Sequence, residues 1–280
     1  MRINKFNLAV RGLAYSAVSL LFLSGGLSSQ AATYTLTDLG TTAHVDADSG
    51  AGMDSWQIGG TEHLAKQWFY YRIGAGVANQ PINAIGSSTL LGSGANYLAL
   101  NYANSQVSLT LTYILTGGGY GAGSADIQET IQVQNVSASP LTFHFFQYSD
   151  FNLLDGLPND TVEFLGVDSV KQTQGVFGIQ EGIVTPPSSR LEAGYAGVGG
   201  TLDNLLNTPT GYDLNNNSGP ITGDVTWSFQ WDHTINPGDS LTILKDKTLI
   251  VPIIPEPTAL SLIGLGLIAM SFRKRINFDS

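Results

Sequence analysis

The sequence predicts an all-β protein whose central part is a two-layer antiparallel β-sandwich. Apolar and polar residues alternate with a period of two in several segments, which indicates strands buried on one face. Only 12% of the residues are charged and 33 are glycine, a composition typical of loop-rich extracellular β proteins. No composition shift or repeat divides residues 32–252, so we expect one domain there, flanked by a signal peptide (1–31) and a sorting tail (253–280).

The alternation is clearest in the last third of the domain. Val225, Trp227, Phe229 and Trp231 fall on one face of an extended segment, where the core explains the two tryptophans better than a sugar-stacking platform does. A second strand is expected from Ser240 to about Val251, and the turn at 236–239 predicts that these two strands form a hairpin. Further strands are expected at 107–113, 127–133, 141–145, 34–39, 68–73, 97–102 and 162–167. Roughly ten such strands suit a sandwich.

Two other sequence features bear on the architecture. Residues 68–71 are four consecutive aromatics, so they must point to both sides of their strand, and one side is either wet or covered. The glycine-rich segment 117–124 resembles a nucleotide-binding loop, but no helix follows to hold phosphates. We therefore expect a hairpin tip at 117–124.

Charge and cysteine content restrict the partners. The chain has 22 acidic and 12 basic residues, and half of the basic residues lie in the two terminal segments. The acidic central part would repel nucleic acid, which makes cations or neutral polymers better candidate partners. Cysteine is absent, which excludes disulfides, thiolate catalysis and cysteine-ligated metals.

The first 31 residues have the features of a secretory signal. Arg2, Lys5 and Arg11 precede an apolar stretch at 13–23, and small residues follow. This order predicts Sec export and cleavage after Ala31. An uncleaved anchor is the alternative, although the apolar stretch is shorter than a bilayer requires.

The C-terminal segment combines three elements. Pro255-Glu256-Pro257 is followed by an apolar stretch at 258–272 and then by Arg273, Lys274 and Arg275. Such a short helix would span a bilayer only marginally, with its basic end on the cytoplasmic side. A permanent anchor and a buried helix of the domain are the alternatives.

This order of elements resembles the PEP-CTERM sorting signal of Gram-negative bacteria. The resemblance covers only the tail. It implies recognition by the membrane protease exosortase, transient anchoring in the inner membrane, removal of the tail, and passage to the outer envelope or extracellular matrix.

The best candidate metal site lies early in the domain. His44, Asp46, Asp48 and Asp54 are closely spaced, and oxygen ligands of this kind bind calcium when one loop brings them together. The spacing departs from the EF-hand pattern, so a solvated acidic loop is the alternative. No other cofactor is expected.

A second acidic group follows the strand at 141–145: Asp150, Asp155, Asp160 and Glu163. Paired carboxylates hydrolyse glycosides when their separation is right, which a sequence does not specify. His144 lies opposite in phase to Phe143 and Phe145, as expected for a hydrogen-bonded residue on a sheet face. The segment 127–150 resembles the supersandwich fold of sugar epimerases and some glycosidases, but this pattern is common among bacterial sandwiches and assigns no activity by itself.

Two functions remain open from the sequence. The sorting tail, the acidic composition and the lack of a catalytic motif favour a non-enzymatic envelope or matrix protein associated with extracellular polysaccharide. The alternative is a carbohydrate-active enzyme in which His144 and loop carboxylates converge on a pocket.

Overall fold

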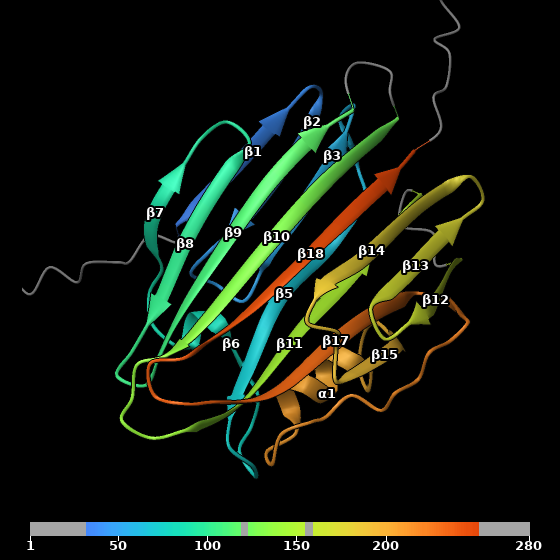
Figure 1. Cartoon of the computed structure of the whole chain (residues 1–280). Coiled ribbons are helices and arrows are strands. Elements are labelled where there is room, and N and C mark those ends of the chain that lie inside the picture. Colours follow the sequence, from blue (N-terminus) through green and yellow to red (C-terminus); the bar gives the residue numbers. More distant parts are fainter. Residues whose placement is uncertain (1–31, 119–122, 155–158, 252–280) are drawn as a thin grey trace, which may run out of the picture. The chain divides into compact units, whose positions relative to one another are not determined.

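The computed structural model describes residues 32–118, 123–154 and 159–251, and this part of the chain forms two antiparallel sheets (Figure 1). The predicted signal peptide and sorting tail lie outside the described residues. The strands begin at Thr33 and end at Ile250, inside the predicted domain. Within the described part, no helix is long and apolar enough to cross a bilayer.

Sheet A contains seven strands in one path and two short strands beside it. Its order is β1 (Thr33–Asp38), β2 (Thr41–Asp46), β3 (Gly52–Ile58), β5 (Leu64–Ile73), β11 (Leu141–Phe151), β17 (Val225–Ile235) and β15 (Arg190–Tyr195), with β4 (Thr61–Glu62) paired to β3 and β6 (Gln80–Pro81) paired to β5.

Sheet B forms the second layer. Its order is β16 (Ile221–Gly223), β12 (Asp160–Gly166), β13 (Ser169–Gln174), β14 (Phe177–Thr185), β18 (Ser240–Ile250), β10 (Ser124–Asn135), β9 (Val107–Gly117), β8 (Tyr97–Ala103) and β7 (Thr89–Ser93). A 3-10 helix, η1 (Ile82–Ala84), and one helix, α1 (Thr201–Asn207), complete the described elements.

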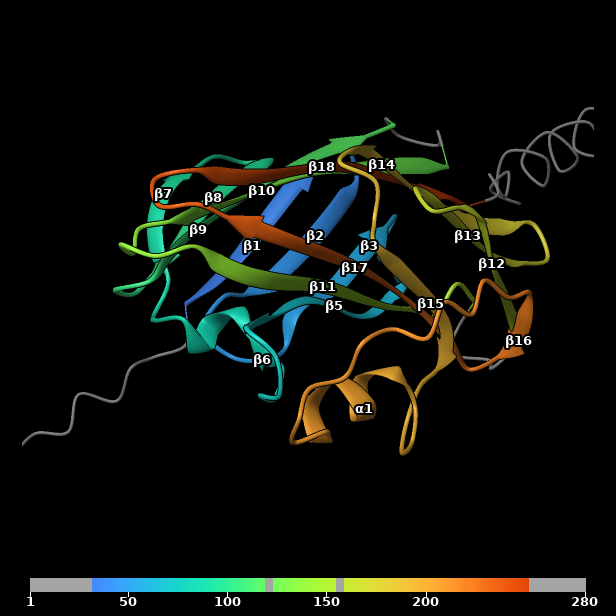
Figure 2. The same cartoon turned by 60° about the horizontal axis from the view of Figure 1, so that its bottom comes forward.

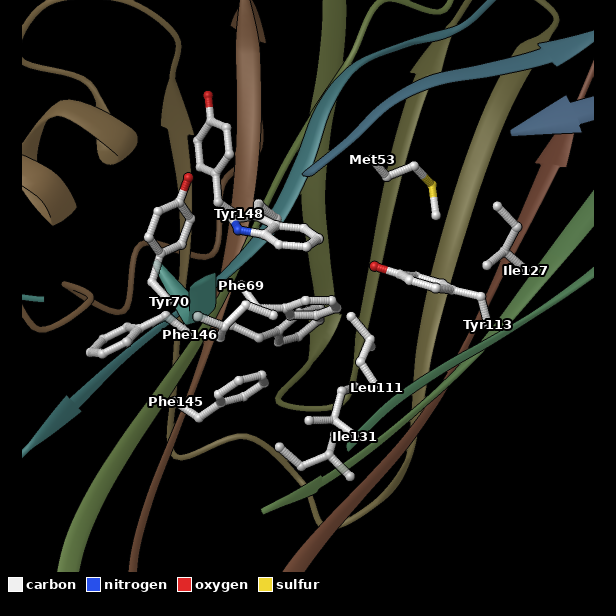
Figure 3. Close-up of a cluster of buried hydrophobic side chains, with 14 of the residues drawn as sticks. Met53, Phe69, Tyr70, Leu111, Tyr113, Ile127, Ile131, Phe145, Phe146 and Tyr148 are labelled. Atoms are coloured by element: carbon white, nitrogen blue, oxygen red, sulfur yellow. The ribbon is translucent and has the colours of Figure 1, made fainter. Parts of the chain in front are cut away.

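The core lies between the sheets, as the alternation predicts. Trp227 and Trp231 are fully buried there, which confirms that they are core residues. Figure 3 shows Leu111 and Ile131 of sheet B on the same side of sheet A as Phe145, whereas Tyr148 extends to its other side. A strand alternates between the two faces of its sheet, so β11 places residues in two different environments.

The second face of sheet A is also largely covered. Trp68 and Tyr70 are buried, although their strand turns Phe69 into the core. Figure 2 shows α1 and its flanking segments on the side of sheet A that faces away from sheet B, which we call the outer face. The aromatic segment at 68–71 therefore has cover on both sides, and the cover comes from loops and η1 rather than from a third sheet.

One predicted pairing is wrong. The segments β17 and β18 do not form a hairpin, because β17 pairs with β11 and β15 in sheet A while β18 pairs with β10 and β14 in sheet B. The turn between them crosses from one layer to the other. Its hydrogen bonds go to Asn135 at the end of β10: Gly238 N donates to Asn135 O at 2.9 Å, and Asn135 N donates to Asp239 O at 3.1 Å.

Several strands were not predicted. The described residues form 18 strands rather than about ten, and β2 and β3 occupy the region predicted to be an acidic loop. Hairpin pairing of β9 with β10 confirms the predicted hairpin at 117–124, whose residues 119–122 lie outside the described part.

Candidate functional site on the outer face of sheet A

Three ionisable side chains form a row across the middle of sheet A. His144 on β11 stands opposite Arg72 on β5 and opposite Asp232 on β17 in the strand register. All three are out of phase with the core aromatics Phe143 and Trp231, so they lie on the outer face. The row therefore follows from strand pairing between segments that are distant in sequence.

His144 and Asp232 form a close pair. His144 Nδ1 lies 2.6 Å from Asp232 Oδ1, and Gln230 Nε2 donates to the same oxygen at 2.8 Å. Burial raises the pKa of Asp232, but hydrogen bonds from His144 and Gln230 outweigh it, so the pKa lies below its usual value. The side chains are 14% and 31% exposed, which leaves the pair accessible. The prediction that His144 is a hydrogen-bonded residue of a sheet face agrees with this geometry.

Arg72 links the row to the segment that covers it. Its Nη2 lies 2.6 Å from Asp213 Oδ1, which also accepts a hydrogen bond from Gln230 Nε2 at 2.9 Å. Its Nη1 donates to Asn79 Oδ1 at 3.1 Å. Desolvation raises the pKa of Asp213, but the hydrogen bonds from Arg72 and Gln230 outweigh this effect, so the pKa lies below its usual value. The bonds therefore favour the ionised form of Asp213, whose side chain is 42% exposed.

Glu192 on β15 anchors that covering segment. It is almost fully buried and accepts hydrogen bonds from Thr201 Oγ1 at 2.6 Å, Tyr212 Oη at 2.8 Å and Asn215 N at 3.1 Å. A buried carboxylate requires such donors. The anchor places the backbone at 212–215 over the sheet, and with it Asp213.

Further along the outer face the groups are mostly hydroxyls. Tyr148 Oη donates to Asp150 Oδ2 at 3.2 Å. Burial raises the pKa of Asp150 to about 6, and the charges of Asp224 and Asp160 add to this effect. The buried hydroxyl oxygens of Tyr70 and Ser228 have no hydrogen-bond partner among the described residues.

This arrangement can bind polar groups and move protons. His144 Nε2 has no hydrogen-bond partner in the described structure, and a histidine whose Nδ1 is held by a carboxylate can act as a base. His144, Asp213 and Asp232 also each offer an atom within 4.8 Å of the others, which is close enough for a metal ion. However, Arg72 at Asp213 and Arg190 Nε, 3.9 Å from Asp232 Oδ2, add positive charge that competes with a cation.

The predicted calcium ligands do not share one loop. Asp46 ends β2, where its carboxylate accepts hydrogen bonds from Ser49 N at 3.1 Å and Ser49 Oγ at 2.6 Å. Asp48 Oδ1 accepts from Ser88 N at 2.7 Å. Asp54, on β3, lies 2.6 Å from His44 Nδ1. Each carboxylate thus has its own protein partner, and calcium binding here stays a prediction.

Two members of the second predicted acidic group, Asp150 and Asp160, lie close to each other. Asp150 and Asp160 are near enough for the charge of one to raise the pKa of the other, and Asp224 joins them. Glu163 lies on β12, and Asp155 is outside the described residues. Sequence reasoning missed Arg72, Asp213 and Gln230 as site residues. Only the strand register, which pairs β5 with β11 and β11 with β17, reveals them.

The fold is similar to that of several solved structures. A putative aldose 1-epimerase from Escherichia coli K12 gives a TM-score of 0.52 at 10% identity over 80% of this chain and 100% of that chain. A galactose mutarotase related enzyme from Lactobacillus acidophilus gives 0.53 at 10% identity over 78% and 97%. A bacterial glucoamylase complexed with acarbose gives 0.54 at 7% identity over 86% of this chain and 36% of that chain. These similarities establish the fold alone.

Sequence comparison identifies the tail. No curated protein matches the chain. Residues 254–275 match the family model of the PEP-CTERM protein-sorting motif, so this chain carries a PEP-CTERM sorting motif, as the order of its tail elements predicts.

Proposed function

We propose that this chain is an exported protein sorted by exosortase, whose β-sandwich binds extracellular polysaccharide through the outer face of sheet A. The PEP-CTERM motif supports the sorting route and a final location in the outer envelope or matrix of a Gram-negative bacterium. The signal peptide with cleavage after Ala31, the membrane helix of the tail and the basic residues 273–275 complete that route.

The observation that carries the binding proposal is the row of Arg72, His144 and Asp232 with its half-exposed neighbour Asp213. In ligand sites, a small number of precisely placed polar groups fix the orientation of the ligand and provide specificity. Carboxylate oxygens accept from sugar hydroxyls, and guanidinium groups donate to them. The similar solved folds include proteins named for aldose, galactose and acarbose, which agrees with a carbohydrate ligand.

Binding explains the electrostatics better than catalysis does. A general acid needs a raised pKa, yet the pKa values of Asp213 and Asp232 are lowered by their partners. Asp150 has a raised pKa, but it is six residues from His144 along β11, about 20 Å for an extended strand. The acid and the histidine are therefore too far apart to act on one glycosidic bond.

The test measures binding of the purified exported protein to a panel of bacterial polysaccharides, with calcium and with a chelator. We expect binding by the unmodified chain and a loss of at least tenfold in affinity for Asp232→Asn. Asp168→Asn is the control for the same chemical change, because Asp168 lies in the turn between β12 and β13 of sheet B and is not among the predicted calcium ligands. Equal affinities for the two variants would contradict the proposed face. Binding lost on chelation would support the calcium prediction.

A carbohydrate-active enzyme is the second candidate, and the pair of His144 and Asp232 favours it. Release of reducing ends from a bound polysaccharide, abolished in His144→Gln, would establish this activity. Binding without release would leave the binding function.

The sorting route has a separate test. Mass spectrometry of the protein recovered from the envelope should find an N-terminus at Ala32 and no residues of the apolar tail. Replacement of Pro255, Glu256 and Pro257 by alanine should leave the tail attached. A retained Met1, or tail removal in the alanine variant, would contradict the route.

A further inference from the structure

Four ionisable side chains meet inside the sandwich, away from the outer face. Lys245 and Lys247 of β18, Glu129 of β10 and Glu181 of β14 are all fully buried between the sheets. The described chain has only four lysines, so half of them lie in the core. Burial of charge is costly unless every charge is paired, which makes the pairing of these groups informative.

The two glutamates have different surroundings. Glu181 Oε2 accepts from Gln147 Nε2 at 2.7 Å and from Trp227 Nε1 at 3.1 Å, and its Oε1 lies 3.2 Å from Lys245 Nζ. These donors suit a carboxylate. Burial alone would raise the pKa of Glu181, but the two lysines lower it. Glu181 therefore stays ionised and pairs with Lys245.

Glu129 contacts both lysines. Its Oε2 contacts Lys245 Nζ, and its Oε1 lies 2.5 Å from Lys247 Nζ. The other contact of Lys247 Nζ is Gln67 Oε1 at 3.0 Å, a neutral acceptor. One ion pair, Lys245 with Glu181, is thus complete without Lys247 and Glu129.

Lys247 and Glu129 can both become neutral without a change in the net charge of the buried cluster. Burial lowers the pKa of Lys247, and the positive charge of Lys245 adds to this effect against the attraction of the glutamates. Transfer of one proton from Lys247 to Glu129 removes two buried charges and leaves an amine beside a carboxylic acid. A neutral amine is a nucleophile, and a neutral acid is an electrophile.

We propose that Lys247 and Glu129 condense into an intramolecular isopeptide bond. Lys247 Nζ attacks Glu129 Cδ, and Lys245, which contacts Oε2, stabilises the negative charge that develops on that oxygen. Oε1 already holds the proton transferred from Lys247, and a second proton passes from Nζ to Oε1 along their existing contact. The Nζ–Cδ bond forms, the Cδ–Oε1 bond breaks, and one water molecule leaves.

The product keeps every remaining charge paired. Oε2 becomes the amide oxygen and still accepts from Lys245, which retains its ion pair with Glu181. The bond would join β10 to β18, which are neighbours in sheet B (Figure 1). It would give a cysteine-free chain a covalent cross-link inside its core.

The test is the mass of the purified, denatured full chain after incubation at neutral pH. We expect a mass lower than the sequence mass by one water molecule, after correction for processing at the two ends. Tandem mass spectrometry of a tryptic digest should show the peptide containing Glu129 linked to the one containing Lys247, with no cleavage after Lys247. An unchanged mass would overturn the proposal, and so would a link through Lys245.

Variants test the assignment. Lys247→Arg keeps the cation but prevents acylation, so it should have the full sequence mass. Lys171→Arg, an exposed lysine on β13, is the matched control and should lack the same water molecule as the unmodified chain. A variant of Lys247 that still loses water between these peptides would contradict the assignment. The mass of the unmodified chain decides the main question even if Lys247→Arg does not fold.

Discussion

His144 Nδ1 lies 2.6 Å from Asp232 Oδ1 across two neighbouring strands, and this pair stands on the face of sheet A opposite the core. The contact joins β11 to β17, and its two residues are 88 positions apart in the chain. Because Gln230 ties Asp232 to Asp213, a change at one carboxylate affects the whole row.

Removal of the charge of Asp232 should lower the free energy of unfolding at neutral pH. It should also make the decrease of that free energy in acid smaller. In the folded state the pKa of Asp232 lies below its ordinary value of 3.8, so its contribution is complete above pH 3.8 and disappears as the pH falls through the folded pKa. We expect Asp232→Asn to lose about 1 kcal/mol at pH 7, since the site is partly exposed. Urea denaturation at pH 7 and pH 3 measures the difference, which should shrink at pH 3. An equal loss at both values would contradict the charge argument.

The contribution of Asp150 to stability should depend on pH with the opposite sign. Burial raises its folded pKa from 3.8 to about 6, so the folded state holds a proton that the unfolded state releases. Stability therefore falls as the pH rises from 3.8 to 6. We expect Asp150→Asn to gain about 1 kcal/mol at pH 7 and nothing at pH 4. Urea denaturation at both pH values checks this, with Glu163→Gln on β12 as the control for the same chemical change. A loss of stability at pH 7 would show that the carboxylate is needed in its charged form.

The sequence predicts the strands of the core better than it predicts their partners. Period-two alternation identifies β9, β10, β11, β17 and β18, because each buries one face against the opposite sheet. The turn at Pro237 and Gly238 has the residues of a hairpin, yet it crosses between sheets. Its hydrogen bonds to Asn135 belong to a second crossover that is distant in the sequence.

The candidate site shows the same limit. His144 is identifiable from its phase between Phe143 and Phe145, which places it on the outer face of its strand. Its partners depend on which strands lie beside β11, and no local pattern specifies that. Asp213 is harder still to predict, since it lies in a segment without regular structure that Glu192 holds in place.

Gly211 should be essential for the position of Arg72. Its φ is +81°, and an added Cβ would lie 2.4 Å from Arg72 Nη1 and 2.5 Å from Val77 O. We expect Gly211→Ala to lose about 3 kcal/mol, of which about 1 comes from the backbone conformation. Gly238→Ala is the matched control, because Gly238 has φ +84° and nothing within 4 Å of an added Cβ. It should lose only about 1 kcal/mol.

Thermal denaturation compares the two glycine variants, and polysaccharide binding separates the local effect from the global one. At a temperature where both are folded, only Gly211→Ala should weaken binding, since it displaces Arg72 from Asp213. If Gly211→Ala and Gly238→Ala lost equal stability and bound polysaccharide equally well, the position of Arg72 would not depend on the close approach of Gly211.

Glu192 should control the segment that carries Asp213. Glu192→Ala would leave the donors of Thr201, Tyr212 and Asn215 without their acceptor, and we expect a loss of about 3 kcal/mol. Tyr212→Phe removes a single hydrogen bond and should cost about 1 kcal/mol. Limited proteolysis under native conditions provides the local readout: new cleavage within 196–220 should appear in Glu192→Ala and be much weaker in Tyr212→Phe. Cleavage that appears first elsewhere would mean that Glu192 supports the whole sandwich rather than this segment.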